Sequence, residues 1–215
     1  MRNRLALSAA IVALAIAAPA PAQQSGQDPD ARAQALVEQM TLDEKVRLVH
    51  GNYPNQMPVR PEGVPLSAGY VPGIPRLGIP AQRMTDASLG VAAAHQHEHD
   101  NTALPSGLAL AATFDPRIAY TGGATIGSEA RTRGFNVMLA GGVNLTREPR
   151  GGRNFEYAGE DPLLAGIIVG EAVRGIQSND IVSTVKHFAL NAQDLGRDVI
   201  NVKMDEAAMR ESDLL

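Results

Sequence analysis

Between residue 83 and the end of the chain, short apolar runs alternate with longer amphipathic stretches. Three runs rich in apolar residues have the length of buried β-strands, namely residues 107–114, 135–141 and 180–185, and residues 83–87 are a further candidate for a short strand. Residues 115–134 and 160–178 instead repeat their apolar side chains at helical spacing. Strands and helices that alternate in this way predict parallel βαβ units, and therefore an α/β fold.

Both predicted helices carry start signals. Asp115 and Asp161 stand at N-cap positions, and each is followed directly by a proline, which suits the first helical residue. Gly134 follows the end of the first helix, where glycine commonly ends a helix. We therefore expect two well-defined crossover helices.

The N-terminal part has a different pattern. Residues 30–40 have helical spacing, and Thr41 and Glu44 form a predicted capping box for a second helix that ends near Gly51. Residues 52–82 are rich in proline and glycine and read as loops. Residues 205–215 predict the start of a last helix.

Two architectures fit this order of elements: a small doubly wound sheet and the first half of a (β/α)8 barrel. The motif GGATIG, residues 122–127, lies inside a helical pattern and not in a strand-to-helix turn, so the dinucleotide-binding fingerprint is missing. A closed barrel usually needs about 250 residues. We therefore predict the N-terminal part of a (β/α)8 TIM-type barrel, truncated before closure, in a fragment of a longer protein.

Residues 1–22 predict a secretory signal peptide, because Arg2 and Arg4 precede an apolar run that ends in small residues. An uncleaved anchor is the alternative. Residues 23–215 would form the partial barrel domain of a periplasmic or secreted protein. The chain has no cysteine, so neither a lipoprotein nor a disulfide framework is expected. The formal net charge of −4 argues against nucleic acid and anionic membranes as partners.

Charged residues cluster where the predicted strands end, which is the functional edge of parallel α/β folds. Asp86 ends one strand, and Lys186 and His187 end another. Arg153 and Arg197 lie in the loops nearby. Together they could bind a ligand with many hydroxyl groups. Alternatively, Asp86 could serve as a helix cap or turn residue, and Arg153 could form an ordinary interstrand salt bridge.

His95, His97 and His99 alternate along the segment HQHEHD, which raises the possibility of a metal site. Zinc sites that act in catalysis are usually assembled from separate elements of a fold, whereas this tract lies in one loop. We expect no specific metal ion and no cofactor, and the role of these histidines stays open.

The segments GRNFE, EDP and KHF, at their mutual spacing, resemble glycoside hydrolase family 3, and in particular its β-glucosidases. The resemblance runs from about residue 32 to the end of the chain. It implies a (β/α)8 or related incomplete barrel followed by an α/β sandwich domain. It also implies that Asp86 grips sugar hydroxyls, and that Arg153, Lys186, His187 and Arg197 supply the other contacts to that sugar.

The chain departs from the family pattern after Asp86. The usual DGP-x-G-x-R is DASLGVA here, with Ala92 at the arginine position. This puts the exact sugar in doubt, and a β-xylosidase or N-acetylhexosaminidase is the alternative within the family. The N-acetylhexosaminidase branch ranks lower because Ala-Leu-Asn, and not Pro-Gly, follows KHF.

A retaining glycosidase needs two carboxyl groups about 5 to 5.5 Å apart. The resemblance places the nucleophilic aspartate in a Ser-Asp-Trp-like context, and the SDL segment at 212–214 does not match it. We therefore expect no catalytic residue in this chain and a nucleophile beyond Leu215. The full-length protein would hydrolyse terminal β-D-glucosyl residues with retention, and this chain alone would be inactive without its missing C-terminal part. The rivals are a non-catalytic sugar-binding protein and a barrel enzyme whose Lys186 and arginines bind phosphate.

Overall fold

The structure is a computed structural model that describes residues 28–60, 62, 64, 66–92 and 101–215. The chain divides into two compact units, Met1–Met40 and Thr41–Leu215. The described part of the first unit is helix α1 (Pro29–Gln39), and the carboxylate of Asp28 accepts the backbone N–H of Asp30 at its start. This confirms the first predicted helix. The predicted signal peptide, residues 1–22, lies outside the described residues.

The second unit begins with helix α2 (Leu42–Leu48) and the predicted capping box. The Thr41 hydroxyl accepts the N–H of Glu44 at 3.3 Å, and the Glu44 carboxylate accepts the N–H of Thr41 at 2.9 Å. Arg76, in the short 3-10 helix η2 (Pro75–Leu77), donates to the same carboxylate. Hydrogen bonds from Arg76 and then Thr41 hold the pKa of Glu44 at about 2. Another 3-10 turn, η1 (Pro54–Gln56), lies between them in the chain.

A four-stranded sheet forms the centre of this unit, with strands β1 (Gly69–Val71), β2 (Gln82–Asp86), β3 (Val137–Leu139) and β4 (Val182–Ser183). Strand β1 is antiparallel to β2, whereas β2, β3 and β4 are parallel and neighbour one another in chain order. A doubly wound sheet would reverse its strand order at a switch point. The uninterrupted order therefore supports the barrel-type architecture over the doubly wound one.

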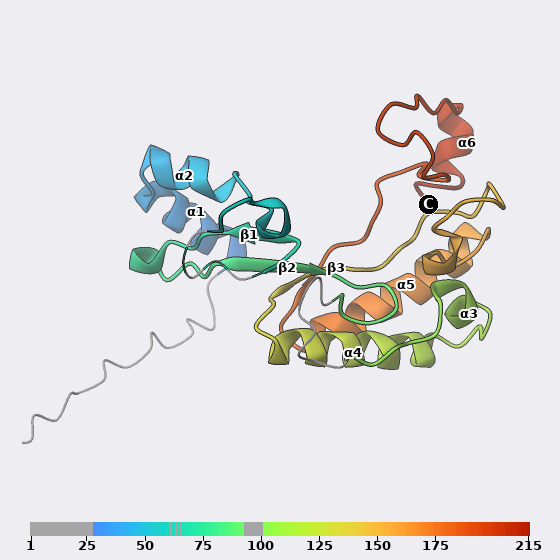
Figure 1. Cartoon of the computed structure of the whole chain (residues 1–215), viewed down its shortest axis with the longest axis horizontal. Helices are drawn as coiled ribbons and strands as arrows, with labels where there is room; N and C mark the ends of the chain where they lie inside the picture. Colours follow the sequence, from blue (N-terminus) through green and yellow to red (C-terminus); the bar gives the residue numbers. More distant parts are fainter. Residues whose placement is uncertain (1–27, 61, 63, 65, 93–100) are drawn as a thin grey trace, which may run out of the picture. The chain divides into compact units, whose positions relative to one another are not determined.

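Two long helices make the crossovers between the parallel strands. They are α4 (Pro116–Thr132) and α5 (Pro162–Gln177), and both begin at the predicted aspartate caps. The helices lie side by side in Figure 1. Their backbones approach closely at Gly123 and Gly175, because a Cβ atom at Gly123 would lie 2.0 Å from the carbonyl oxygen of Ala172. Small residues thus set the distance between the two helices.

The predicted strand at 107–114 is wrong. Residues Gly107–Ala111 form helix α3, and the hydroxyl of Ser106 caps it by accepting the N–H of Ala109 at 3.0 Å. The run consists largely of leucine and alanine, which are strong helix formers, and it lacks the β-branched residues that favour strands. A continuous apolar run alone cannot separate a short buried helix from a strand.

The last predicted strand is shorter and less buried than expected. Ile181 is buried, but Val182 is 61% exposed, because β4 has a neighbouring strand on one side only within the described residues. Beyond β4, Lys186 still forms a parallel bridge with Gly142. The sheet therefore continues far enough to bring Lys186 to the carboxyl end of the parallel strands.

The core lies between the sheet and the crossover helices. Its members include Met138 and Ala140 of the central strand region and Ile126 and Ile176 of the two helices. The C-terminal segment carries helix α6 (Glu206–Arg210), which confirms a helix there but ends earlier than expected. No helix in the described part of the chain is long and apolar enough to cross a membrane.

Candidate functional site

The predicted strand ends place Asp86 and Lys186 beside each other. Asp86 is the last residue of β2, and Lys186 follows β4. These two strands lie on either side of β3 in the sheet. The ammonium nitrogen Nζ of Lys186 lies 2.7 Å from Oδ1 of Asp86. The lysine side chain is mostly buried and the aspartate is about half exposed. Residues 100 positions apart thus form one hydrogen-bonded ion pair at the carboxyl ends of the strands.

His187 is held by two partners that the sequence did not single out. The side-chain oxygen of Asn144 accepts the backbone N–H of His187 at 2.8 Å, and the Asn144 amide nitrogen donates to the His187 carbonyl at 3.0 Å. The hydroxyl of the buried Tyr157 lies 3.3 Å from ring nitrogen Nδ1 of His187. The peptide bond between Lys186 and His187 is cis. Backbone and ring of His187 are both fixed.

Arg153 forms a salt bridge, but its partner lies in its own loop and not on another strand, as the interstrand alternative had supposed. It begins the 3-10 helix η3 (Asn154–Glu156), and its guanidinium forms an ion pair with the buried Glu156. The hydroxyl of Ser88, which follows β2, donates to the second oxygen of Glu156 at 2.7 Å. Glu156 therefore ties the loop after β2 to the loop after β3.

Arg197 lies in the chain segment between β4 and α6. Its guanidinium is 3.4 Å from the carboxylate of Asp194 and is about half exposed. Arg197 and His187 line the same open cavity, of about 560 Å³, formed largely by residues 187–193 together with Ile200 and Val202. The structure therefore brings His187 and Arg197 to one cavity and pairs Lys186 with Asp86, while Arg153 is engaged with Glu156.

Both His187 and Glu156 have shifted pKa values. Burial lowers the pKa of His187 below its ordinary value of 6.5, and the positive charges of Arg153 and Lys186 add to this effect. Burial alone would raise the pKa of Glu156, but hydrogen bonds from Arg153 and Ser88 more than offset it and leave the pKa lowered. At neutral pH the ring of His187 is therefore neutral and Glu156 is ionised, so Glu156 is not a proton donor.

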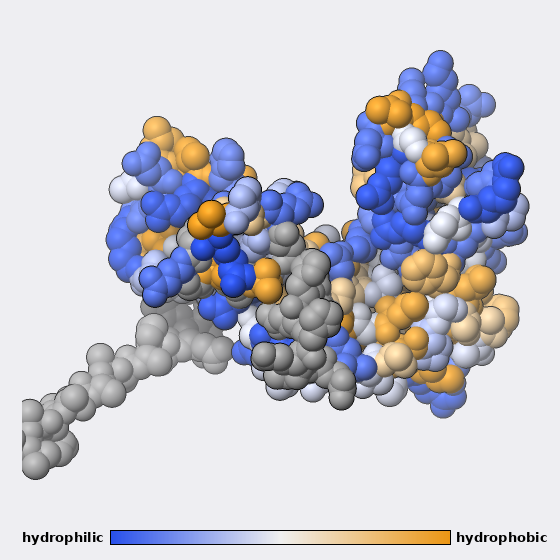
Figure 2. Space-filling model, in the orientation of Figure 1, coloured by the Kyte–Doolittle hydropathy of each residue, from blue (hydrophilic) through white to orange (hydrophobic). Residues whose placement is uncertain are grey.

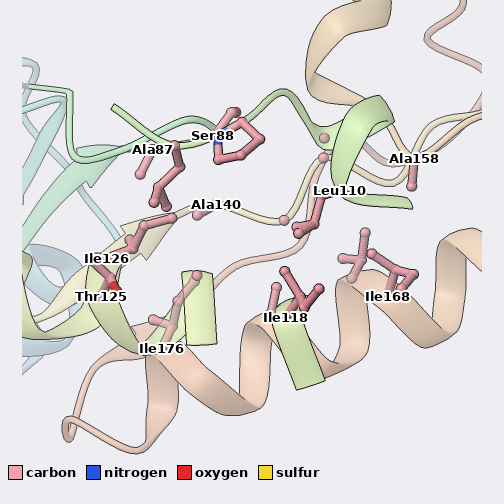
Figure 3. Close-up of a pocket in the computed structure, with 18 of the residues that line it drawn as sticks. Ala87, Ser88, Leu110, Ile118, Thr125, Ile126, Ala140, Ala158, Ile168 and Ile176 are labelled. Atoms are coloured by element: carbon pink, nitrogen blue, oxygen red, sulfur yellow. The ribbon is translucent and has the colours of Figure 1, made fainter. Parts of the chain in front are cut away.

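A second cavity, of about 240 Å³, is apolar and is lined by none of these charged side chains. Figure 3 shows Ile118, Ile126, Ile168 and Ile176 projecting from α4 and α5 toward the ends of β2 and β3. Its lining is almost entirely carbon, and Ser88 on its wall has its hydroxyl engaged with Glu156. This space belongs to the packing between helices and sheet. The polar cluster, and not this cavity, can bind a hydroxylated ligand.

The residues described here contain no group of three or more histidine, aspartate or glutamate side chains that could hold a metal ion. His95, His97 and His99, the basis of the metal hypothesis, lie outside the described residues. The second aspartate considered from sequence, Asp213, is nearly fully buried and forms an ion pair with Arg147 at 2.5 Å. Its partner makes it part of the packing of the C-terminal segment.

Asn144 and Tyr157 were not predictable as site residues from their local sequence. The one available signal for Asn144 is its place between the apolar residues Val143 and Leu145, because a polar side chain that is buried there needs hydrogen-bonding partners. That signal does not name the partner. Tyr157 reads as a core aromatic, and its hydroxyl becomes relevant only because the fold brings His187 against it. Glu156 is the last residue of the GRNFE segment, but its partner Ser88 lies 68 positions away, so their contact was not predictable.

A model of the glycosyl hydrolase family 3 N terminal domain matches residues 71–215. The chain is 40% identical over 167 residues to probable beta-glucosidase F of Emericella nidulans, covering 77% of this chain and 18% of that protein. It is 38% identical over 193 residues to beta-glucosidase BoGH3A of Bacteroides ovatus, covering 85% of this chain and 24% of that protein. The chain thus spans about a quarter or less of the length of these relatives.

Solved structures agree with these relatives. Beta-glucosidase 3B from Thermotoga neapolitana, in complex with glucose, superposes with a TM-score of 0.79 at 35% identity, over 85% of this chain and 26% of that one. The β-glucosidase DesR from Streptomyces venezuelae, in complex with D-glucose, gives a TM-score of 0.76 at 38% identity, over 85% and 22%. The likeness confirms the predicted α/β fold of a partial barrel.

Proposed function

Because the chain belongs to glycosyl hydrolase family 3, we propose that it is part of a β-glucosidase that removes terminal non-reducing β-D-glucosyl residues with retention of configuration. The chain supplies part of the sugar-binding subsite. In this proposal, Asp86, Arg153, Lys186, His187 and Arg197 contact the pyranose. The nucleophile and the acid/base lie beyond Leu215, so the 215-residue chain does not turn over a glucoside. The proposed substrates are β-glucosides or oligosaccharides, and no cofactor takes part.

The observation that carries this proposal is the ion pair of Asp86 and Lys186 beside His187. A carboxylate oxygen accepts hydroxyl protons, and an ammonium group donates to hydroxyl oxygens, so the pair can bind adjacent hydroxyls of one sugar. Two relatives of similar fold are described in complex with glucose, which supports the same ligand here. Relatives named beta-glucosidase favour glucose over the xylose and N-acetylhexosamine alternatives.

The phosphate-binding alternative is weakened by the charges around the site. Lys186, Arg153 and Arg197 each have a carboxylate partner, namely Asp86, Glu156 and Asp194. An anion would have to compete with these carboxylates, whereas a neutral sugar can bind to both signs of charge at once. Because positive and negative side chains are paired in this cluster, it suits a neutral polyol better than an anion.

Glucose titration of the full chain tests the proposal. We expect saturable binding that Lys186→Met weakens by at least tenfold, while Lys45→Met, on the exposed face of α2, leaves it unchanged. The ion pair is partly solvated, so its loss should cost no more than about 1 kcal/mol of folding stability. Binding and stability are thus separable by calorimetry and denaturant unfolding.

Three results would contradict the proposal. Equal glucose affinity in Lys186→Met and the parent chain would remove the lysine from the site. Saturable binding of inorganic phosphate without binding of glucose would favour the anion site. Turnover of an aryl β-glucoside by this chain alone would place the catalytic carboxyls within it, against the expectation that they lie beyond Leu215.

The proposed location is the periplasm or the cell exterior. It rests on the basic start, apolar run and small residues of positions 1–22. Cell fractionation of the expressed protein, with N-terminal sequencing of the exported form, should find cleavage close to Ala22. Retention of the intact N-terminus in the membrane fraction would favour the uncleaved anchor.

A further inference from the structure

Nitrogen Nδ1 of His187 faces two polar groups, and their hydrogen bonds determine which nitrogen of the ring carries the proton. The hydroxyl of Tyr157 and the side-chain oxygen of Asn144 each lie 3.3 Å from Nδ1. The tyrosine and histidine rings meet edge to face, with an angle of 84° and a centroid distance of 6.2 Å. Tyr157 is 2% exposed, so its hydroxyl depends on protein partners.

The partners of Tyr157 leave its hydroxyl proton one acceptor. The amide nitrogen of Asn191 lies 3.3 Å from the hydroxyl oxygen and can only donate, so the oxygen accepts there. In the part of the chain that the structure describes, the remaining hydrogen-bonding partner of this hydroxyl is Nδ1 of His187. Burial also raises the pKa of Tyr157 above its ordinary value of 10.0, so the hydroxyl keeps its proton at neutral pH.

Asn144 does not need the ring proton. Its oxygen already accepts the backbone N–H of His187 at 2.8 Å, and its amide nitrogen donates to the carbonyl of the same residue at 3.0 Å. If Nδ1 carried the proton and donated to Asn144, the Tyr157 hydroxyl would lose its acceptor. If Nδ1 is unprotonated, every one of these polar groups keeps a partner.

We propose that Tyr157 is a positioning residue that holds His187 in the neutral Nε2–H tautomer, so that His187 donates a hydrogen bond to the ligand. Nε2 is the ring nitrogen that these two partners leave available, and His187 lines the open cavity shared with Arg197. A neutral ring agrees with the lowered pKa of His187.

The tautomer determines that His187 donates, and does not accept, a hydrogen bond in the proposed sugar contacts. That the ligand is a sugar rests on the proposed function. His187 and Lys186 both donate, so they bind oxygen lone pairs of the ligand, whereas Asp86 accepts a hydroxyl proton. A ligand therefore needs at least one group that accepts beside one that donates. Neighbouring hydroxyls of a pyranose meet both needs, because a hydroxyl can do either.

The test is long-range proton–nitrogen NMR of the ¹⁵N-labelled full chain at neutral pH, which distinguishes the two tautomers of a neutral imidazole. Comparison with His187→Gln identifies the signals of this residue among the 5 histidines. We expect the Nε2–H form in the parent chain. Tyr157→Phe removes the hydroxyl, so the ring should shift toward the Nδ1–H form that donates to Asn144. Tyr120→Phe, on the partly exposed side of α4, should change nothing.

Finding the Nδ1–H form or an even mixture in the parent chain overturns the proposal, and this measurement needs no variant to fold. An unchanged tautomer in a folded Tyr157→Phe chain overturns it as well. The same variant should weaken glucose binding roughly five- to tenfold, the effect of one hydrogen bond. An Nε2–H ring in a chain that does not bind glucose would instead leave the tautomer proposal standing and remove the sugar-binding function.

Discussion

At the scale of single residues, the site is a set of charges that neutralise one another. Lys186 pairs with Asp86 across two strand ends, and Arg153 pairs with Glu156 three residues further along the same loop. Buried or half-buried charges are costly unless they are paired, so each charge depends on its own partner. The paired side chains can still form hydrogen bonds with a neutral ligand, and their opposite charges leave little net electrostatic field at the site.

The lowered pKa of His187 predicts a pH dependence of folding. Its folded-state pKa lies below 6.5, so between these two values the unfolded chain binds more protons. Stability from this residue is therefore complete above about pH 6.5 and is lost as the pH falls toward the folded-state pKa. Denaturant unfolding at pH 7 and pH 5 should show a larger loss in the parent chain than in His187→Gln. Equal losses would contradict the shift.

At the scale of elements, the distance between α4 and α5 depends on glycines with different roles. Gly175 lies where a Cβ atom would be 2.1 Å from the carbonyl oxygen of Tyr120. Gly170, one and a half turns earlier on the same helix, is exposed, and a Cβ atom there would meet nothing within 4 Å. The close packing of α4 against α5 thus requires glycine at position 175 but not at position 170.

The two positions form a matched test. Gly170→Ala should stabilise the fold by up to about 1 kcal/mol, because alanine favours the helix over glycine. Gly175→Ala should destabilise it by about 1 to 3 kcal/mol, because the added methyl group forces the two helices apart. Thermal and denaturant unfolding measure both. A gain of stability at Gly175, or a comparable loss at Gly170, would show that the helices do not approach as described.

The elements also show where patterns in the sequence succeed. Capped helices were predicted correctly, because Asp115 and Asp161 act on backbone groups within one turn. The run at 107–114 was assigned to the wrong class, since the choice between helix α3 and a strand depends on what lies beside it. Strand β1 was missed, because its Gly69–Val71 segment becomes a strand by pairing with β2 and with Asn52, and no local pattern shows these partners.

At the scale of the whole molecule, single ion pairs join distant segments. Arg147, after β3, donates to Asp213 and to the hydroxyl of Ser212, and thereby attaches the segment that carries α6. Apolar side chains also lie exposed near the sheet edge and along the C-terminal segment, including Val182, Phe188, Leu195 and Val199. Figure 2 shows hydrophobic patches among hydrophilic ones on this segment.

Removal of the Arg147 side chain should loosen this segment locally. Arg147→Leu leaves the nearly buried carboxylate of Asp213 without its cation, so amide hydrogen exchange over residues 205–214 should rise by at least tenfold. Exchange in α4 and α5 should stay unchanged. Arg150→Leu is the control, because Arg150 is exposed and pairs with Glu148 of its own loop. The same exchange rate in both variants would argue against the attachment.

The sequence by itself determined the features that depend on neighbours along the chain. These are the capped helices, the capping box of α2, the parallel βαβ order, and the charged residues that end the strands at Asp86 and Lys186. Caps and periodicity act over a few residues, so they can be read directly. The family motifs carried the assignment to glycosyl hydrolase family 3.

Only the tertiary structure decided which side chains meet. The ion pair of Lys186 and Asp86, the link from Ser88 to Glu156, and the contact of Tyr157 with His187 each join residues that are far apart in the chain. Such contacts depend on strand order, register and helix distance, which no local pattern specifies. For that reason, the residues that bind a ligand could be named from the sequence, whereas those that orient them could not.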